Sequence, residues 1–529
     1  MKKKNLLFII SSLVAVTSLS SCYFLRITIN DSTSNSYSNP TGNAIYKTPN
    51  YTSSFSKDNL TIEKVGTSFD YHYLPSTGNS KLLVIPIQFT DDSFSTTELS
   101  RIQNSFFGDS TNTGWQSVAS YYNTSSYGKL NITGEVAPTI TLSSTVADAQ
   151  SAATAYEKKN SGNYTDSILE AAVKKLDSNG FDFTGYDSNS DGYVDAVWMV
   201  YSASYDTNSD FYWAYTTWTS SSSKCDSLSF STYSWASVDF LTEYNYYRTD
   251  KTKNGDAHTF IHETGHMMGL DDYYSYDYDG KTNYDTPTGG IDMMDFNIGD
   301  HDSYSKYILG WKTPTVVTPS YLAANNNQLS LSSFTENGDS LLIPIYDSDG
   351  NDDYNETAFD EYLLLELYTP TGLNEMDSNN LYTNNLREYT KPGILVYHVN
   401  SRIGKVSVSG SSLVWDGYSY DKLPSSWSSY VGYTYICSNT RSYCYDSSLS
   451  DTGLKFYRGR LISLLPSTGT KIEGKKTGYS SNECLFTKGD SFKDSYSSFV
   501  FDEGTSPRYD FSVDSVTTSK ATLTFSDFN

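Results

Sequence analysis

The hydrophobic positions in the first part of the chain alternate between short apolar runs and amphipathic stretches. The runs KLLVIPIQF (residues 81–89) and DAVWMVYSA (residues 195–203) are typical of buried strands. The stretches TTELSRIQNSFFG and YTDSILEAAVKKLDSNG have apolar residues at helical spacing and end at Gly108 and Gly180. Alternation of strands with helices predicts an α/β or α+β domain, which we assign to residues 76–316.

The pattern changes past about residue 316. The apolar runs SLLIPIY, EYLLLELY and GILVYHV alternate with turns rich in Gly, Ser, Asn and Asp, and helical spacing nearly disappears. This pattern of apolar runs and turns predicts an all-β, sandwich-like module over residues 317–529. The predicted fold class is therefore α+β, with a mixed domain followed by an all-β module.

The N-terminus has the pattern of a targeting signal. MKKKNLLFIISSLVAVTSLSSC combines a lysine-rich start, a short apolar run and small residues before Cys22. The ending LSSC resembles the bacterial lipobox, so residues 1–22 are interpreted as a lipoprotein signal peptide with lipidation at Cys22. This predicts a protein anchored by lipid on the extracellular face of a bacterial membrane; the alternative is a plain secretory signal. Residues 23–75 are polar and aperiodic, and are interpreted as a tether or a short pro-segment.

Composition and net charge limit the classes of molecule that the chain is expected to bind. The chain has 529 residues, 15% aromatic residues and a formal net charge of −24. Such an acidic surface repels nucleic acid, and no basic cluster follows the first residues, so we expect no nucleic-acid partner. We expect contact with the membrane through the lipid at Cys22 alone.

Four cysteines follow Cys22, namely Cys225, Cys437, Cys444 and Cys484. Outside the cell they can form disulfides. Cys437 and Cys444 are close enough in sequence to clip a hairpin, but three pairings are possible and spacing does not choose among them.

The stretch HTFIHETGHMMGLDDYY concentrates three of the six histidines. Its apolar positions follow a helical stripe, which Asp256 can cap and Gly269 can end. On such a helix His262 and His266 lie one turn apart on one face, so both imidazoles can bind one ion. Glu263 lies beside them and can reach a water on that ion. This is the His-Glu-x-x-His arrangement of zinc peptidases.

A catalytic zinc ion needs a third protein ligand. The spacing from His262 through Gly269 to Asp272 matches the extended metzincin pattern, with aspartate in place of the last histidine. Asp271 is the alternative ligand. A bare His-Glu-x-x-His occurs by chance in many helices, so the glycine and the aspartate carry the prediction of Zn²⁺. His258 is expected to pack in the core, or to contact a metal ligand without binding the ion itself.

Metzincins place a methionine in a turn beneath the zinc ion, and Met293 and Met294 lie at a suitable distance along the chain. The alternative is that this methionine pair is plain core packing. The other histidines, His72, His301 and His398, are isolated and are expected to be structural.

The stretch YDSNSDGYVD is spaced like a calcium loop. Possible ligands are Asp187, Asn189, Asp191, the Tyr193 carbonyl and Asp195. The twelfth position holds a tryptophan, so a full EF-hand is excluded. We predict Ca²⁺ here, and the alternative is an acidic turn without metal.

Together these segments resemble the immune inhibitor A family of secreted bacterial metallopeptidases. The resemblance rests on segments such as LLVIPIQFTDDSF, HETGHMMGLDDYY, MMDFNIGDHDSYSKYILGW and KPGILVYHVN, over roughly residues 80–400. It implies a metzincin-like zinc endopeptidase domain that acts outside the cell and is followed by a β-rich module. The family often has proline before the ligand aspartate, where this chain has Asp271, so the choice between Asp271 and Asp272 stays open.

The expected activity is hydrolysis of extracellular proteins or peptides, with host proteins as one candidate class of substrate. Glu263 is the expected general base, and Tyr304 or Tyr307 is suggested as an oxyanion contact. The alternative function is a surface adhesin or glycan-binding lipoprotein whose peptidase fold is secondary. The tyrosine-rich stretch SYVGYTYICSNTRSYCYD favours glycan or matrix binding by the β-module.

Overall fold

The computed structural model describes most of the chain after residue 59. The described residues are 60–67, 71–157, 164–205, 210–219, 223–242, 255–274, 286–296, 298–346, 350, 354–379, 389–409, 412–415, 418–422, 431–435, 437, 439–440, 444–445, 456–457, 460–470, 472, 480–502 and 504–528. The predicted signal peptide and Cys22 lie outside them. None of the helices within these ranges has the length and apolar character needed to cross a membrane.

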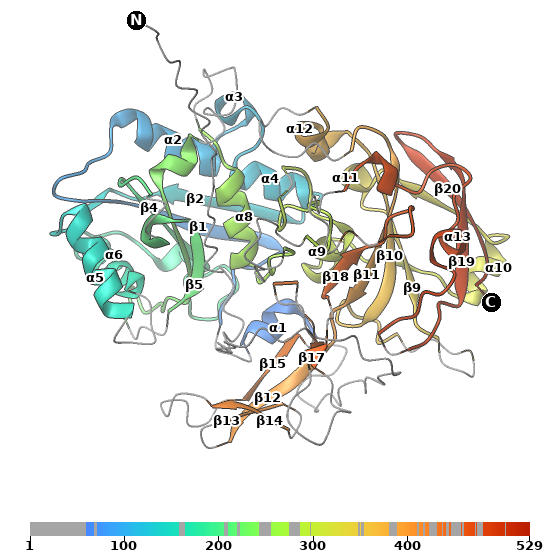
Figure 1. The fold of residues 1–529 in the computed structure, drawn as a ribbon. Helices are drawn as coiled ribbons and strands as arrows, with labels where there is room; N and C mark the ends of the chain where they lie inside the picture. Colours follow the sequence, from blue (N-terminus) through green and yellow to red (C-terminus); the bar gives the residue numbers. More distant parts are fainter. Residues whose placement is uncertain are drawn as a thin grey trace, which may run out of the picture.

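A six-stranded sheet organises the first half of the molecule, and its main strand order is β2-β1-β4-β6-β5 (Figure 1). All pairs are parallel except β5 with β6, which is antiparallel, and β3 extends the pairing of β1. The strands are β1 (Gly78–Gln88), β2 (Leu130–Val136), β3 (Ile140–Thr141), β4 (Ala196–Tyr201), β5 (Tyr215–Trp218) and β6 (Thr232–Ser237).

Both faces of this sheet are covered, which explains why β4 and β6 are buried along their whole length. Leu83 and Val197 on one face share a core with Leu169 of α6. Leu82 and Trp198 on the other face share a core with residues of α2, α4 and α8. The helices are α2 (Thr96–Phe107), α3 (Ser110–Thr113), α4 (Val118–Ser125), α5 (Val146–Glu157), α6 (Thr165–Ser178) and α8 (His258–Met267).

The second half contains a five-stranded sheet of order β18-β11-β10-β9-β7 and a three-stranded sheet of order β19-β20-β8. Side chains from both sheets, among them Leu365, Val396, Phe511 and Leu523, form one hydrophobic cluster, so the two sheets pack face to face. The strands are β7 (Thr315–Val316), β8 (Gln328–Ser332), β9 (Ser340–Pro344), β10 (Glu361–Tyr368), β11 (Gly393–Asn400), β18 (Ile462–Leu464), β19 (Tyr509–Val516) and β20 (Lys520–Asp527).

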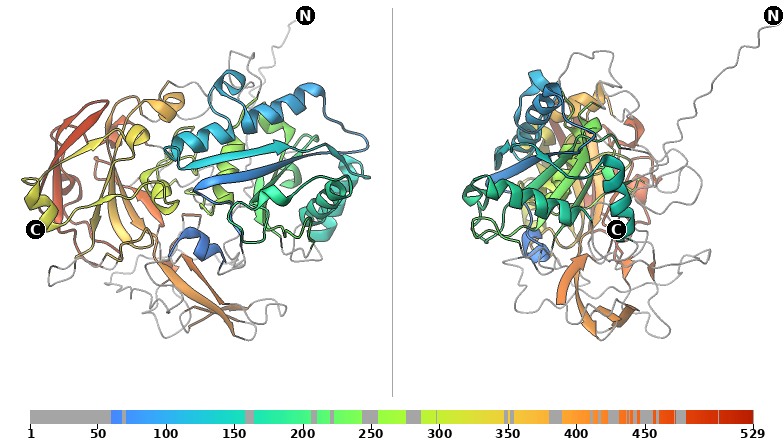
Figure 2. Two further views of the ribbon diagram at one scale, coloured as in Figure 1. Left: turned by 180° about the vertical axis from the view of Figure 1, so that it is seen from behind. Right: turned by 90° about the vertical axis from the view of Figure 1, so that its left-hand side faces the viewer.

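A smaller sheet of order β14-β13-β12-β15 projects away from both halves in every view (Figure 2). It consists of β12 (Ile403–Ser409), β13 (Ser412–Trp415), β14 (Tyr418–Lys422) and β15 (Val431–Tyr435), and the pair β16 (Cys444–Tyr445) and β17 (Phe456–Tyr457) lies nearby in the chain.

The region after residue 317 is not purely β. It contains the short helices α10 (Pro319–Ala324), α11 (Phe334–Asn337), α12 (Glu375–Ser378) and α13 (Phe492–Tyr496). The sequence pattern missed them because four to six residues are too few to show helical spacing. Local signals were present, since the Thr318 side chain caps α10 and a proline follows it.

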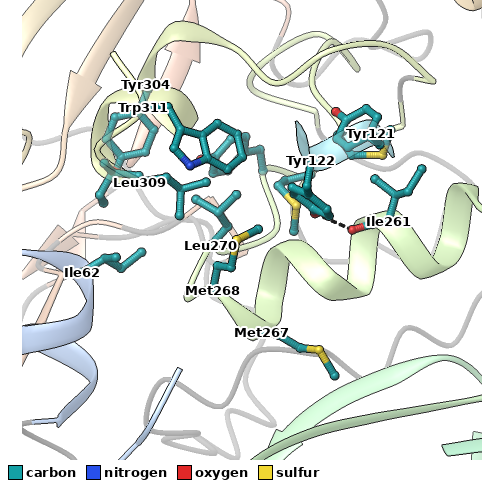
Figure 3. Close-up of a cluster of buried hydrophobic side chains, with 14 of the residues drawn as sticks. Ile62, Tyr121, Tyr122, Ile261, Met267, Met268, Leu270, Tyr304, Leu309 and Trp311 are labelled. Carbon is teal, nitrogen blue, oxygen red and sulfur yellow. Dashed lines mark hydrogen bonds between the residues drawn. The ribbon is translucent and has the colours of Figure 1, made fainter. Parts of the chain in front are cut away.

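The two halves share one core. Leu364 and Tyr397 of the five-stranded sheet belong to the same hydrophobic cluster as Ile261 of α8 and Trp311. Figure 3 shows part of this cluster, in which the Tyr122 hydroxyl donates to the Ile261 carbonyl at 2.6 Å. The predicted boundary near residue 316 therefore falls inside a continuous packed region.

Part of the predicted tether is folded. Helix α1 (Ile62–Thr67) buries Ile62 and Val65 in the shared core. The Leu74 amide donates to the Met267 carbonyl at 2.9 Å. These residues of the 23–75 segment are packed against α8 rather than free, which is what a pro-segment docked on the domain would show.

The cysteines are partly paired. Cys437 forms a disulfide, whereas Cys225 and Cys484 are buried cysteines that are not disulfide-bonded. The predicted clip between Cys437 and Cys444 stays a prediction, because the Cys444 side chain lies outside the described part of the structure.

Candidate metal centre

Helix α8 ends where the sequence indicates, but it begins one residue later than predicted, because its N-cap is Ala257 and not Asp256. Asp256 accepts a hydrogen bond from the His258 amide at 3.0 Å. Gly269 adopts a positive φ of 95°, and a Cβ there would lie 2.7 Å from the Tyr73 ring. Only glycine suits both conditions, so the chain reverses tightly after the helix and returns toward it.

Three donor atoms converge at this reversal. Asp272 Oδ1 lies 3.0 Å from His262 Nε2 and 3.2 Å from His266 Nε2. The two Nε2 atoms are 3.2 Å apart. Ligand atoms at zinc bonding distances in a tetrahedral shell lie about 3.3 Å from one another, so the three separations suit a shared zinc ion. Asp272 is the acidic residue that the structure brings to both histidines.

The opposite ring nitrogens are fixed by backbone carbonyls. His262 Nδ1 lies 2.7 Å from the Met293 carbonyl oxygen, and His266 Nδ1 lies 2.7 Å from that of Leu270. A carbonyl can only accept, so each Nδ1 carries a hydrogen, and in its neutral form each ring directs an Nε2 lone pair at the common point. Two lone pairs and a carboxylate oxygen at such separations repel unless a cation lies among them. The donor set therefore fits a divalent metal.

Burial strengthens this arrangement. The side chains of His266 and Asp272 are fully buried, whereas that of His262 keeps 14% exposure. Burial alone would raise the pKa of Asp272, but His266 and His262 outweigh it and hold the pKa well below its ordinary value. Asp272 is therefore ionised, and a route to solvent remains beside His262.

Glu263 lies next to the donors. One carboxylate oxygen of Glu263 is within 4.8 Å of a ring nitrogen of each histidine. The Thr216 hydroxyl of β5 donates to Glu263 Oε2 at 2.8 Å, so a side chain from the antiparallel edge strand orients the carboxylate. Burial raises the pKa of Glu263 above its ordinary value, which suits a group that exchanges protons near neutral pH.

The methionine turn supports the helix in two ways. Met293 supplies the carbonyl that fixes His262, as described above. Met294 packs beneath Gly265, where an added Cβ would lie 2.5 Å from the Met294 sulfur. The Met294 carbonyl also accepts from the Tyr273 amide at 2.8 Å, so the turn is bonded to the loop that carries Asp272.

Sequence reasoning missed the aspartate that shapes this turn. Asp292 has an unusual φ of 153° and is fully buried. Its carboxylate accepts from the amides of Met294 and Asp302, each at 2.6 Å. Its place directly before the methionine pair was the available signal, since a short acceptor side chain commonly holds its own turn.

A described tyrosine that the sequence did not suggest contacts the donors. Tyr304 is packed in the shared core, and the Tyr307 hydroxyl bonds that of Tyr354. Tyr274 is the tyrosine that hydrogen-bonds Asp272, and burial together with Asp272 and Glu263 raises its pKa well above the ordinary value. Its position two residues after the ligand places it there.

The remaining histidines have structural partners. His258 starts α8. His72 Nδ1 lies 2.8 Å from Asp191 Oδ2. His301 is buried beside the methionine turn, and burial lowers its pKa to about 3. His398 Nε2 lies 2.8 Å from Glu361 Oε1 in the five-stranded sheet.

The predicted calcium loop is closed by its own backbone. Asp187 accepts from the amides of Asp191 and Gly192, each at 3.0 Å. Asp195 is buried and accepts from the amides of Ser188 and Lys81, which joins the loop to β1. Among the described residues, three His, Cys or acidic side chains meet within 4.8 Å at α8 and at Glu361, His398 and Asp502, and not at this loop. Calcium there stays a prediction.

Comparison with protein-family models and with curated proteins found no match to this chain. The resemblance to the immune inhibitor A family therefore stays a prediction, and the function is argued from the geometry of the centre.

Proposed function

We propose that the chain is a zinc metalloendopeptidase that hydrolyses extracellular proteins. One observation carries this proposal: two imidazole nitrogens and a carboxylate oxygen converge within 3.2 Å, and a buried glutamate that is not one of the three lies beside them. Zinc hydrolases use this combination of three protein ligands and a separate base.

Each residue has a role in the proposed reaction. His262, His266 and Asp272 would hold the ion, which polarises a scissile carbonyl and acidifies a water when bound. Glu263 takes a proton from the attacking water and delivers it to the leaving amine nitrogen. The Thr216 hydroxyl holds the Glu263 carboxylate in place for both transfers.

Strand β5 supports a peptide as the substrate. Among the described strands it pairs with β6 alone, so it is an edge strand of the sheet. An extended peptide can add to such an edge through main-chain hydrogen bonds. Because Thr216 of β5 contacts Glu263, a peptide on this edge would pass next to the proposed base.

The same proposal includes the cellular location of the protein and a second metal ion, Ca²⁺. The N-terminal signal with Cys22 supports a lipid-anchored protein on the extracellular face of the membrane. The Asp187 loop remains the proposed site for Ca²⁺. The alternative function, a glycan or matrix adhesin, stays a prediction, because the tyrosine side chains of its tyrosine-rich stretch lie outside the described part of the structure.

The first test is metal content and cleavage measured on the same preparations. Wild type and Glu263→Gln should each contain one zinc per chain, and His262→Ala should contain less. Casein cleavage should fall about 10²–10⁴-fold in Glu263→Gln, the usual contribution of a general base. His72→Ala is the matched control and should retain zinc and activity. Wild-type activity in Glu263→Gln, or no zinc in wild type, would falsify the proposal.

A further inference from the structure

A buried asparagine from the second half of the molecule reaches the loop that carries the third ligand. Asn439 has no exposed surface. Its Nδ2 donates to the Tyr273 carbonyl and to the Ile462 carbonyl, both at 2.9 Å, and its Oδ1 accepts from the Ile462 amide at 3.1 Å. Both ends of the side-chain amide are therefore used to join the ligand loop to β18.

The Tyr273 backbone is fixed from both sides. Its amide donates to the Met294 carbonyl at 2.8 Å, and its carbonyl accepts from Asn439. Tyr273 directly follows Asp272, so these bonds restrain the backbone that orients the Asp272 carboxylate. The methionine turn supplies one restraint, and a residue 166 positions away supplies the other.

Asn439 is itself held rigidly. Arg460 Nη1 donates to the Asn439 carbonyl at 2.9 Å, and Arg460 is buried. The disulfide of Cys437 lies two residues earlier in the chain and limits the freedom of this segment. A donor held in this way can impose a position on its acceptor instead of following it.

We propose that Asn439 is a positioning residue for the third metal ligand: it fixes the Tyr273 carbonyl and thereby holds Asp272 Oδ1 against the two histidines. The proposal rests on the proposed zinc site. An exposed carbonyl could bond water in place of Asn439, but the Tyr273 carbonyl is in a buried residue and loses its side-chain donor when Asn439 is replaced. The loop would then relax, and the ligand would leave its place.

The test measures zinc affinity by competition with a chelator. Asn439→Asp keeps the shape of the side chain and removes its donors, and we expect about a 10-fold weaker affinity, as for other outer contacts of metal ligands. Asn439→Ser is a second variant in case Asn439→Asp does not fold. Asn400→Ala is the matched control, because Asn400 is equally buried in the five-stranded sheet and bonds Asp502 instead of the ligand loop.

A double-mutant cycle separates positioning from general stability. The affinity lost on Asn439→Asp should disappear when Asp272 is already alanine, because no carboxylate is then left to position. An equal loss in both backgrounds, or no loss in either, would overturn the role of Asn439 and leave the zinc site standing. Wild type that binds no zinc would overturn the zinc site itself, and with it this inference.

Discussion

Two clusters in this molecule combine histidine with buried acids, but different groups contact the acid in each. In one, His262, His266 and Asp272 meet at the end of α8. In the other, His398 and Glu361 meet on neighbouring strands of the five-stranded sheet. Each cluster brings three histidine or acidic side chains within 4.8 Å, so the types of donor do not distinguish them.

The hydrogen-bond partners make the difference. Arg402 Nη2 lies 2.7 Å from Glu361 Oε2, and the amide of Asp502 donates to Glu361 Oε1. The charge of Glu361 is thus compensated by the protein, and His398 uses Nε2 to bond it. At α8 the histidines give their Nδ1 hydrogens to carbonyls, and no arginine or lysine is within ion-pair distance of Asp272 among the described residues. The two clusters therefore differ in whether a fixed guanidinium already balances the acid.

Loss of a histidine should give the largest effect and the clearest contrast. His266→Ala should weaken zinc binding more than about 100-fold, since even outer contacts of metal ligands typically contribute 10–100-fold. His398→Ala should leave zinc affinity unchanged. Chelator competition on both variants measures this, and equal losses would show that the two clusters are not distinct.

Removal of Arg402 should be the next largest effect. Arg402→Met leaves Glu361 buried without its cation, so the free energy of unfolding should fall by about 3–5 kcal/mol. Zinc content should stay at the wild-type level, because Arg402 pairs with Glu361 of the five-stranded sheet and is not one of the α8 donors. Urea unfolding with parallel metal analysis checks both statements; a stability unchanged by the substitution would mean that Glu361 is compensated by other groups.

A smaller, pH-dependent effect should distinguish two glutamates of strand β10. Burial raises the pKa of Glu366 to about 8, whereas Arg402 and His398 outweigh burial and lower that of Glu361. Folded Glu366 therefore keeps its proton up to about pH 8, although the ordinary value is 4.5. The folded state binds more protons across this range, so its stability falls as the pH rises.

A glutamine at position 366 cannot ionise, so Glu366→Gln removes the fall in stability at high pH. Its side-chain oxygen can still accept from the Ser303 amide. We expect the same Tm as wild type near pH 4 and a Tm about 2–4 °C higher at pH 9. Glu361→Gln is the matched control and should be less stable than wild type at pH 9. Thermal scans at the two pH values measure this; a Glu366 variant without a pH-dependent gain would contradict the assignment.

The local part of the site follows from spacing. Residues four apart on a helix share a face, and a glycine permits the reversal that returns Asp272, so His262, His266 and Asp272 could be predicted together. The strands β1 and β4 could also be predicted, since each contains an unbroken apolar run, residues 82–87 in β1 and 196–201 in β4. The short helices after residue 317 were missed for lack of periodicity.

The contacts that complete the site connect distant parts of the chain. Thr216 meets Glu263, the Met293 carbonyl meets His262, and Asn439 meets Tyr273. None of these pairs has a sequence signature, because hydrogen bonds to backbone carbonyls and between distant side chains depend on how sheets and helices pack. The suggestion of Tyr304 or Tyr307 as an oxyanion contact had no such geometry behind it, and the structure brings Tyr274 to Asp272 instead.

The sequence by itself determined the two histidines, the glutamate beside them and the helix that presents them, because these depend on helical periodicity, and it left Asp271 and Asp272 as the two candidates for the third donor after the glycine. Only the tertiary structure decided which nitrogen of each histidine faces the common point, which acid is compensated by arginine, and how the second half holds the ligand loop. The physical reason is that protonation and charge compensation depend on neighbours in space, and those neighbours are brought together by a core that spans both halves.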